Sequence, residues 1–338
     1  MLKIDAFPHI IPRKLYDRMF EHSTGEAANL RKRVTGVPVL YDLDERFRVM
    51  ERFGPEYRQI LTLSSPPIET LGPPAVTRDL ARLANEEMAE LCRRYPERFA
   101  GFAASLAMND PDAAVREAER AVSDLGALGV QIFTNVNGLA LDDPRFAPLF
   151  AAMDRLDKPI WVHPARAAGH PDYPTEQRSK YELWWVFGWP YETAIFMSRL
   201  IFSGVLDRHP RLRILTHHGG GMVPHFAGRI GPGLDQMGAR TPDEDLTGLR
   251  RTMTKRPYDY YRMFYGDTAL FGAEHALRCA FEFFGVEHML FGSDMPFDPE
   301  KGPMFIRETI ANIEALGLSE KDRTAIYEGN ARRVLGVG

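Results

Sequence analysis

Four residues whose side chains bind metals or move protons stand at the ends of short apolar runs. They are His9, His163, His218 and Asp294. Imidazole and carboxylate groups form the usual donor set for Zn²⁺ or a similar divalent ion. Such a site keeps an open position for water or substrate, where the bound ion acts as a Lewis acid. The chemistry open to these residues is therefore metal-assisted, with a histidine available for proton transfer.

The elements that must position these residues are eight short apolar runs, separated by segments of helical pattern. Several runs are nearly continuous in Ile, Val, Leu and Phe, as expected of strands buried on both faces of a parallel sheet. In a barrel of such strands the carboxyl ends meet on one face, where active sites are built. The runs are residues 2–7, 57–64, 99–106, 130–134, 159–163, 212–217, 263–267 and 288–294.

The alternation of strands and helices favours one α/β domain over residues 1–338, a (β/α)₈ TIM barrel. A doubly wound open sheet is the alternative. Helices are expected at 79–95 and 111–128, the second capped by Asp110. The segment 164–199 is too long for a plain connection and is rich in Trp and Tyr. We expect it to form an aromatic-rich insertion after strand 5, over the site.

Composition and charge narrow the class of protein. The net charge is −4, without long runs of like charge, so neither nucleic acid nor an acidic membrane surface is expected as a partner. Cys92 and Cys279 are the two cysteines, and their wide separation argues against a disulfide framework or a zinc knuckle. No segment has the pattern of a signal peptide or a membrane span. We expect a cytoplasmic protein that acts on a small molecule.

Longer motifs spread over nearly the whole chain resemble a known family. They are IDAFPHIIP at 4–12, PIWVHPA at 159–165, WWVFGWPYETA at 184–194, RLIFSGVLDRHPRLRILTHHGGGMVPHFAGRI at 199–230 and LFGSDMPF at 290–297. The most specific pieces are His-Gly-Gly with Pro six residues after the histidine, and Gly-Ser-Asp-x-Pro. The chain resembles the metal-dependent decarboxylases of the amidohydrolase superfamily, related to aminocarboxymuconate semialdehyde decarboxylase and γ-resorcylate decarboxylase.

The resemblance assigns metal binding and proton transfer to particular residues. It makes His9 the second histidine of a first-strand pair, and His163 and Asp294 the ligands from the fifth and eighth strands. It gives His218, directly before the glycines, a proton-transfer or water-activating role, with Asp294 as a second catalytic group. The implied cofactor is a divalent metal ion, with Zn²⁺ first and Mn²⁺ or Mg²⁺ as alternatives.

The substrate is expected to touch three further residues. Arg229, eleven residues beyond His218, matches an arginine that holds a substrate carboxylate, in some relatives across a dimer interface. The resemblance therefore favours a homodimer. Trp185 falls where the family has an aromatic wall. Phe7 shares a strand face with His9 and is expected to face the substrate.

Phe7 is also the departure from the family pattern. The family has His or Glu at this first ligand position, and phenylalanine can donate nothing to a metal. Three protein ligands with water or substrate would still complete a tetrahedral site. Asp5 lies on the same strand face, and we expect it to hydrogen-bond the barrel floor.

The motifs leave three functions open. The first, which we expect, is the non-oxidative decarboxylation of a small aromatic or unsaturated carboxylic acid. The second is metal-dependent hydrolysis of a lactone or amide, or hydration of a double bond, because a metal-activated water can use the same residues. The third is a degenerate barrel that lost its metal with Phe7 and has no catalytic role.

Overall fold

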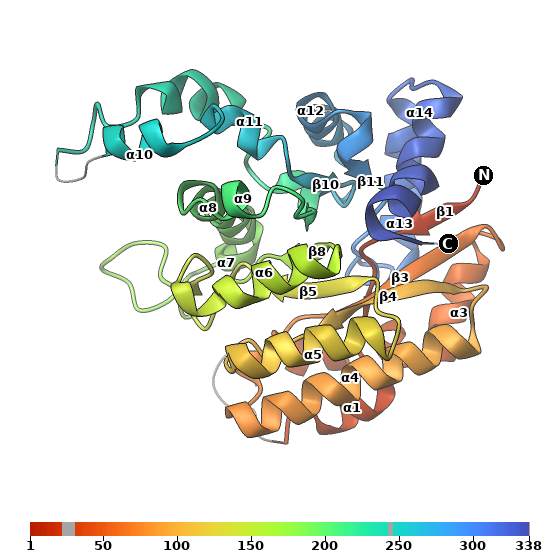
Figure 1. Cartoon of the computed structure of the whole chain (residues 1–338). Coiled ribbons are helices and arrows are strands. Elements are labelled where there is room, and N and C mark those ends of the chain that lie inside the picture. Colours follow the sequence, from red (N-terminus) through yellow and green to blue (C-terminus); the bar gives the residue numbers. More distant parts are fainter. Residues whose placement is uncertain (22–30, 243–245, 338) are drawn as a thin grey trace.

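A parallel sheet runs through the centre of the molecule (Figure 1) in the computed structural model, which describes residues 1–21, 31–242 and 246–337. Its strand order is β1-β3-β4-β5-β8-β9-β10-β11, with β2 beside β3, and every described pair in it is parallel. The strands are β1 Lys3–Asp5, β2 His9–Ile10, β3 Tyr57–Leu63, β4 Phe99–Ser105, β5 Gly129–Phe133, β8 Ile160–His163, β9 Ile214–Thr216, β10 Tyr265–Asp267 and β11 Met289–Leu290. A separate hairpin pairs β6 Asn135–Val136 with β7 Leu139–Ala140.

Backbone hydrogen bonds bring the two edges of the sheet together. The N–H of Ala6 donates to the carbonyl of Phe291 at 2.8 Å, and the N–H of Asp294 donates to the carbonyl of Phe7 at 3.1 Å. The first strand segment thus lies beside the chain around β11. The sheet is a nearly closed barrel, which confirms the predicted (β/α)₈ fold and makes the open-sheet alternative wrong. Each of the eight predicted runs contains a strand of this barrel.

Helices fill the connections and cover the outside of the barrel, with α4 and α5 side by side against β4 and β5 (Figure 1). Helix α4 begins earlier than predicted because Pro74 suits the first turn of a helix. Asp110 caps α5 as predicted, accepting a hydrogen bond from the N–H of Ala113 at 3.1 Å. The helices are α1 Arg13–Arg18, α3 Leu43–Glu51, α4 Pro74–Arg94, α5 Pro111–Ser123, α6 Ala147–Leu156, α7 Leu183–Val186, α8 Gly188–Phe202, α9 Val205–Arg208, α10 Leu246–Thr252, α11 Pro257–Tyr261, α12 Glu274–Phe284, α13 Pro303–Ala315 and α14 Glu320–Thr324.

The segment predicted as an insertion after strand 5 has two parts. Residues 164–182 contain no strand or α-helix, and the aromatic part that follows lies in α7 and α8. In the described part of the chain, no helix is both long and apolar enough to cross a membrane.

The barrel interior is filled by one cluster of buried side chains drawn from most of its strands. Trp161 and Leu215 belong to this cluster, as does Val337 near the chain end. The indole N–H of Trp161 crosses the interior to donate to the carbonyl of Ala6 at 2.9 Å. Because strand side chains alternate between faces, a residue two positions after an interior residue also faces inward. This rule decides which polar residues reach the carboxyl end of the barrel interior.

Candidate active site

Four buried residues at the carboxyl ends of barrel strands form one cluster, His9, His163, His217 and Asp294. One donor atom from each lies within 4.8 Å of the other three. His163 stands two residues after Trp161, and His217 two residues after Leu215, so the strand alternation directs both rings into the interior. We call these four residues the His-Asp cluster.

Asp294 lies at the centre of the cluster. Its Oδ1 is 2.9 Å from Nε2 of His9 and 3.1 Å from Nε2 of His217. Among the described residues, Nε2 of His9 nevertheless has no hydrogen bond of acceptable geometry. Nε2 of His217, in contrast, is hydrogen-bonded to Asp294, so two imidazole nitrogens converge on one carboxylate oxygen, as ligands of a shared centre would. The donor set therefore fits a divalent metal ion.

The other ring nitrogens of two histidines are held by the protein. Nδ1 of His163 donates to the carbonyl of Pro164 at 2.7 Å, and Nδ1 of His217 is hydrogen-bonded to Oδ2 of Asp267. Such bonds fix the tautomer and leave Nε2 free to bind a metal. Asp267 thus orients the ring of His217.

Burial and neighbouring charges set the protonation of the cluster. Burial lowers the pKa of His9 and holds the pKa of His163 well below its ordinary value, so both rings are neutral as metal ligands must be. Burial also acts to lower the pKa of His217, but Asp267 and Asp294 outweigh it and raise the pKa to about 9. Burial acts to raise the pKa of Asp294, but its histidine partners hold it well below the usual range. Asp294 is therefore a carboxylate.

His218 lies beside the cluster rather than in it. Its Nε2 is 3.6 Å from Oδ2 of Asp294, and its ring centroid is 3.9 Å from that of His217. Both of its ring nitrogens are buried without a hydrogen-bond partner in the described chain. His218 is near enough to act on a bound molecule, and its proton-transfer role stays a prediction.

The backbone at two of these residues adopts the left-handed conformation. His218 has φ 56° and Asp294 has φ 61°, values that side-chain-bearing residues seldom adopt. The turn after His218 also needs glycine, because a Cβ on Gly220 (φ 79°) would lie 2.7 Å from the ring of Phe284. Backbone strain of this kind concentrates at functional sites.

Phe7 contributes a fully buried ring next to the cluster. The ring stacks on His217 with centroids 3.9 Å apart and meets His9 edge-on at 5.7 Å. Its contact with substrate stays a prediction. Asp5 makes hydrogen bonds, as expected, but within the barrel wall rather than the floor, where it accepts from the Tyr57 hydroxyl and from the N–H of Ser293 at 3.0 Å.

Two predicted substrate residues do not reach the His-Asp cluster within this chain. Trp185 is half-buried, donates to Oε2 of Glu182 at 3.1 Å and meets Trp189 at a centroid distance of 6.5 Å. The aromatic wall beside the cluster is Trp189 instead, whose ring lies 5.1 Å from that of His163. Arg229 is exposed at the start of the short π-helix Arg229–Gly233 and has no described contact with the cluster.

Arg33 is a candidate that the sequence did not reveal. Its guanidinium lies 4.1 Å from the ring centroid of Phe297 and 5.5 Å from that of Trp189. These rings contact the cluster, Phe297 at 5.7 Å from His9 and Trp189 at 5.1 Å from His163. Arg33 therefore spans two aromatic side chains that border the metal-binding residues.

The charge of Arg33 is not neutralised by an ion pair within the described chain. Burial lowers its pKa, while the carboxylates of Asp294 and Glu182 raise it. A partly buried guanidinium without a carboxylate partner can accept an anionic group from a ligand. Arg33 lies in an Arg-Lys-Arg run outside every recognised motif, so no sequence signal distinguished it.

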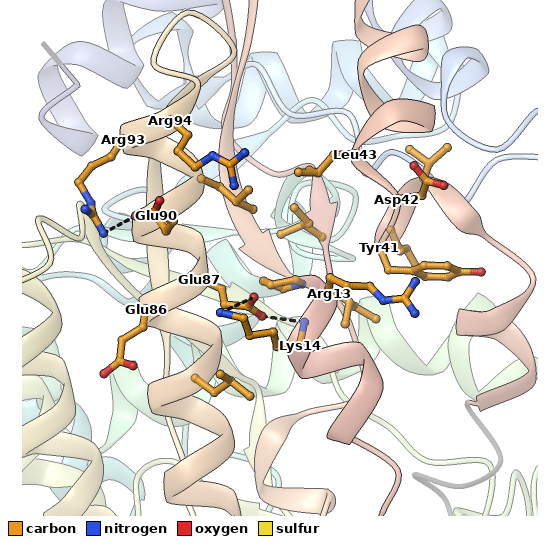
Figure 2. A pocket seen from close by; sticks show the side chains of 17 residues that line it. Arg13, Lys14, Tyr41, Asp42, Leu43, Glu86, Glu87, Glu90, Arg93 and Arg94 are labelled. Carbon is orange, nitrogen blue, oxygen red and sulfur yellow. Dashed lines mark hydrogen bonds and ion pairs between the residues drawn. The ribbon is translucent and has the colours of Figure 1, made fainter.

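A hollow of about 570 Å³ lies elsewhere, between α1, α3 and α4 (Figure 2). Two pairs of its charged side chains contact each other: Glu90 contacts Arg93 at 2.7 Å, and Glu87 contacts Lys14 at 3.8 Å. Glu87 also accepts from the N–H of Lys14 at 2.9 Å, at the start of α1. This groove contains none of the unpartnered donors found in the His-Asp cluster, so we do not assign it the chemistry.

Comparisons with known proteins agree with this site. The family model described as amidohydrolase matches residues 37–337. The chain is 29% identical to 2-amino-3-carboxymuconate-6-semialdehyde decarboxylase of Dictyostelium discoideum, covering 99% of this chain and 92% of that protein. It is 31% identical to γ-resorcylate decarboxylase of Rhodococcus jostii, covering 85% of each.

A solved structure with the same fold carries a metal. It is dihydroxybenzoic acid decarboxylase from a Polaromonas species, with bound manganese and the inhibitor 2-nitroresorcinol. It superimposes with a TM-score of 0.76 at 27% identity, covering 99% of this chain and 97% of the other. From its match to the family model and its similarity to these proteins, the chain belongs to the amidohydrolase family, in the branch that contains decarboxylases.

Proposed function

We propose that this protein is a metal-dependent, non-oxidative decarboxylase of small aromatic or unsaturated carboxylic acids. The observation that carries the proposal is the buried His-Asp cluster with Arg33 and aromatic rings beside it. The similarity to decarboxylases over most of the chain supports the reaction type.

The residues divide between holding the cofactor and holding the substrate. His9, His163 and Asp294 would hold a divalent ion, which would supply a Lewis acid for substrate oxygen atoms. Arg33 would bind the substrate carboxylate through charge-assisted hydrogen bonds. The ring of Trp189 would pack against a planar substrate and exclude water from it.

His218 would carry the proton that the reaction requires. When the bond between ring carbon and carboxylate breaks, the electron pair stays on the carbon and CO₂ leaves. The carbon must then accept one proton. Two observations support this role for His218: it borders Asp294, and both of its ring nitrogens are free of protein partners in the described chain.

The identity of the metal and the cellular location belong to the same proposal. Imidazoles with one carboxylate suit Zn²⁺, whereas the Polaromonas enzyme has bound manganese. We place Zn²⁺ first and Mn²⁺ second. Cys92 and Cys279 are both free thiols, which is consistent with a reducing compartment, and we place the protein in the cytoplasm.

A homodimer would give Arg229 and Trp185 a role. Helix α8 and the residue before it expose three apolar side chains at a spacing of four, Phe187, Tyr191 and Ile195. An exposed apolar stripe of this kind suits an isologous interface. Arg229, exposed in its own chain, would then serve the partner's substrate. Sedimentation should show a dimer, and a fully active monomer would remove this part of the proposal.

The experiment that tests the function measures CO₂ release from hydroxybenzoates and unsaturated acids by protein loaded with Zn²⁺ or Mn²⁺. Run in D₂O, the reaction should place one deuterium on the product carbon that lost the carboxylate. Arg33→Met should raise KM by about tenfold or more for the same acid, because the bound carboxylate loses a charged partner. Uptake of ¹⁸O from water into product, without CO₂, would instead identify a hydrolase or hydratase.

A further inference from the structure

We infer that His217 serves as a metal ligand in place of the first-strand ligand that Phe7 removes. This inference rests on the proposed metal-dependent function. The family resemblance assigns a ligand to position 7 and gives His217 no role. A phenyl ring has no donor atom, so a site built on the family pattern alone would lack one ligand.

Ring positions put His217 where the missing ligand is needed. The ring centroid of His217 is 5.6 Å from that of His9, and the centroid of Phe7 is 5.7 Å from the same ring. Measured from His163, the distances are 5.3 Å for His217 and 6.3 Å for Phe7. His217 is as close as Phe7 to one ligand and closer to the other.

Two neighbours fix the orientation of the His217 ring. Asp267 accepts the hydrogen bond from Nδ1 and is itself held by two backbone N–H groups at 3.1 and 3.2 Å. Phe7 stacks on the ring with an angle of 17° between the planes. Nε2 consequently faces Oδ1 of Asp294 at 3.1 Å. A carboxylate that holds one imidazole nitrogen while the other binds metal is a recurrent support for histidine ligands.

Without metal, Nε2 of His217 donates a hydrogen bond to Oδ1 of Asp294 at 3.1 Å, and a bound ion would displace that proton. The bond to Asp267 already anchors the ring in the barrel wall. Nε2 instead joins Nε2 of His9 around the same carboxylate oxygen of Asp294. Donors from two different strand ends that meet at one oxygen atom define a coordination centre. His217, at the end of β9, thus compensates for the ligand that Phe7 removes from the first strand.

The test is an exchange of the two side chains, read out as metal affinity. Apo-protein is titrated calorimetrically with Zn²⁺ for the parent, His217→Ala, Phe7→His and the double variant Phe7→His/His217→Ala. His217→Ala should weaken binding by about 100-fold or more, since a ligand contributes at least as much as its outer partners. The double variant should recover at least about tenfold of that loss, because an imidazole returns to the first strand.

His218→Ala is the matched control, because it removes an adjacent buried histidine that borders Asp294 but lies outside the cluster. It should change Zn²⁺ affinity by less than about tenfold. Phe7→His alone should also change affinity by less than about tenfold, because His217 already fills the position. Circular dichroism melting of each apo-variant identifies any that fail to fold, and the recovery in the double variant then carries the test.

The outcomes separate this inference from the proposed function. A His217→Ala protein that binds Zn²⁺ as tightly as the parent overturns the ligand assignment, whatever the enzyme's reaction. A double variant that is folded but no tighter than His217→Ala overturns the compensation. Metal-loaded parent protein that releases no CO₂ from any acid overturns the function and leaves the ligand assignment standing.

Discussion

Two neighbouring buried polar regions of the barrel differ in how fully their hydrogen-bonding groups are paired within the protein. In the first, which we call the wall network, Asp5 accepts from Tyr57 and from both the N–H and the hydroxyl of Ser293. Arg46 of α3 donates to Oε1 of Gln59 at 2.8 Å, and its Nη2 is the one atom of this network without a partner in the described chain. In the second, the His-Asp cluster, Nε2 of His9 points toward Asp294 but has no aligned partner in the described chain.

The difference in pairing indicates that the wall network serves stability, whereas the His-Asp cluster serves function. A buried polar group with its hydrogen bonds made stabilises the fold, whereas one left without a partner destabilises it by about 1–3 kcal/mol. The wall network should therefore contribute to the free energy of unfolding. In the His-Asp cluster, the unpartnered Nε2 of His9 should detract from it, whereas the hydrogen bond between His217 and Asp294 should add to it. A hydrogen bond links the two regions, because Arg46 of the wall network also donates to the carbonyl of His9 at 2.7 Å.

The largest expected effect is the loss of metal on breaking the cluster. His163→Ala and Asp294→Ala should each remove most of the roughly one divalent ion per chain and lower kcat/KM by about 10⁴-fold or more. The apo-form of Asp294→Ala should also melt below the apo-parent, because Nε2 of His217 loses its buried hydrogen-bond partner. Elemental analysis and calorimetry test this together. Stoichiometric metal in both variants would remove the site.

A smaller loss is expected at the residue beside the cluster. His218→Asn should lower kcat by about 10²- to 10⁴-fold, the range of a lost proton-transfer group. Metal content should stay close to that of the parent because His218 is outside the set of ligands. Elemental analysis on the purified variant checks the second part, and loss of metal would make His218 a ligand.

Breaking the wall network should instead lower the stability of the fold. Asp5→Asn should lower the free energy of unfolding by about 2–4 kcal/mol, because buried donors at Tyr57 and Ser293 lose a matched acceptor. Urea unfolding of the apo-protein measures this change. A variant as stable as the parent would show that the comparison between the two regions does not hold.

Glu69 belongs to neither region and tests separately how an unpartnered buried group affects stability. It is buried in the short helix Ile68–Thr70, and its Oε1 has no partner in the described chain. Burial raises its pKa to about 8, above its ordinary value of 4.5. Between these pH values the unfolded carboxyl releases its proton and the folded one retains it, so stability falls as pH rises through that window.

The change Glu69→Gln should remove that dependence. Relative to the parent, the variant should gain at most about 3 kcal/mol at pH 7 and little at pH 4. Thermal melts from pH 4 to 8 provide the measurement, with the same series on Glu97→Gln, an exposed carboxylate, as the control. Parallel curves for Glu69→Gln and the parent would contradict the assignment.

The sequence predicted the fold because its strands have a simple signature. Buried parallel strands are apolar throughout, so the runs at 130–134 and 159–163 could be recognised without any motif. Strand ends gather at one face of a barrel, which is why His9, His163 and Asp294 could be grouped. Helix bounds such as that of α5 were less accurate, since the pattern past Ser123 remains helical in composition.

The candidate site was predicted less completely, for two physical reasons. The His-Gly-Gly motif indicates a role for His218 and none for His217, which directly precedes it. Strand alternation from Leu215 would have selected His217 as the inward ring. Arg33 could not be found by any such rule. Arg33 lies in a helical stretch, residues 31–35, and its approach to Trp189 is a contact between distant parts of the chain that no local pattern encodes.

The left-handed backbone at His218 and Asp294 has a consequence for evolution and engineering. Glycine at either position would relieve strain worth about 1 kcal/mol or more. A library sorted only for heat resistance should therefore enrich glycine there and return well-folded, inert barrels. Selection for turnover is the force that keeps side chains at these positions, so a copy of the gene released from that selection should decay here early.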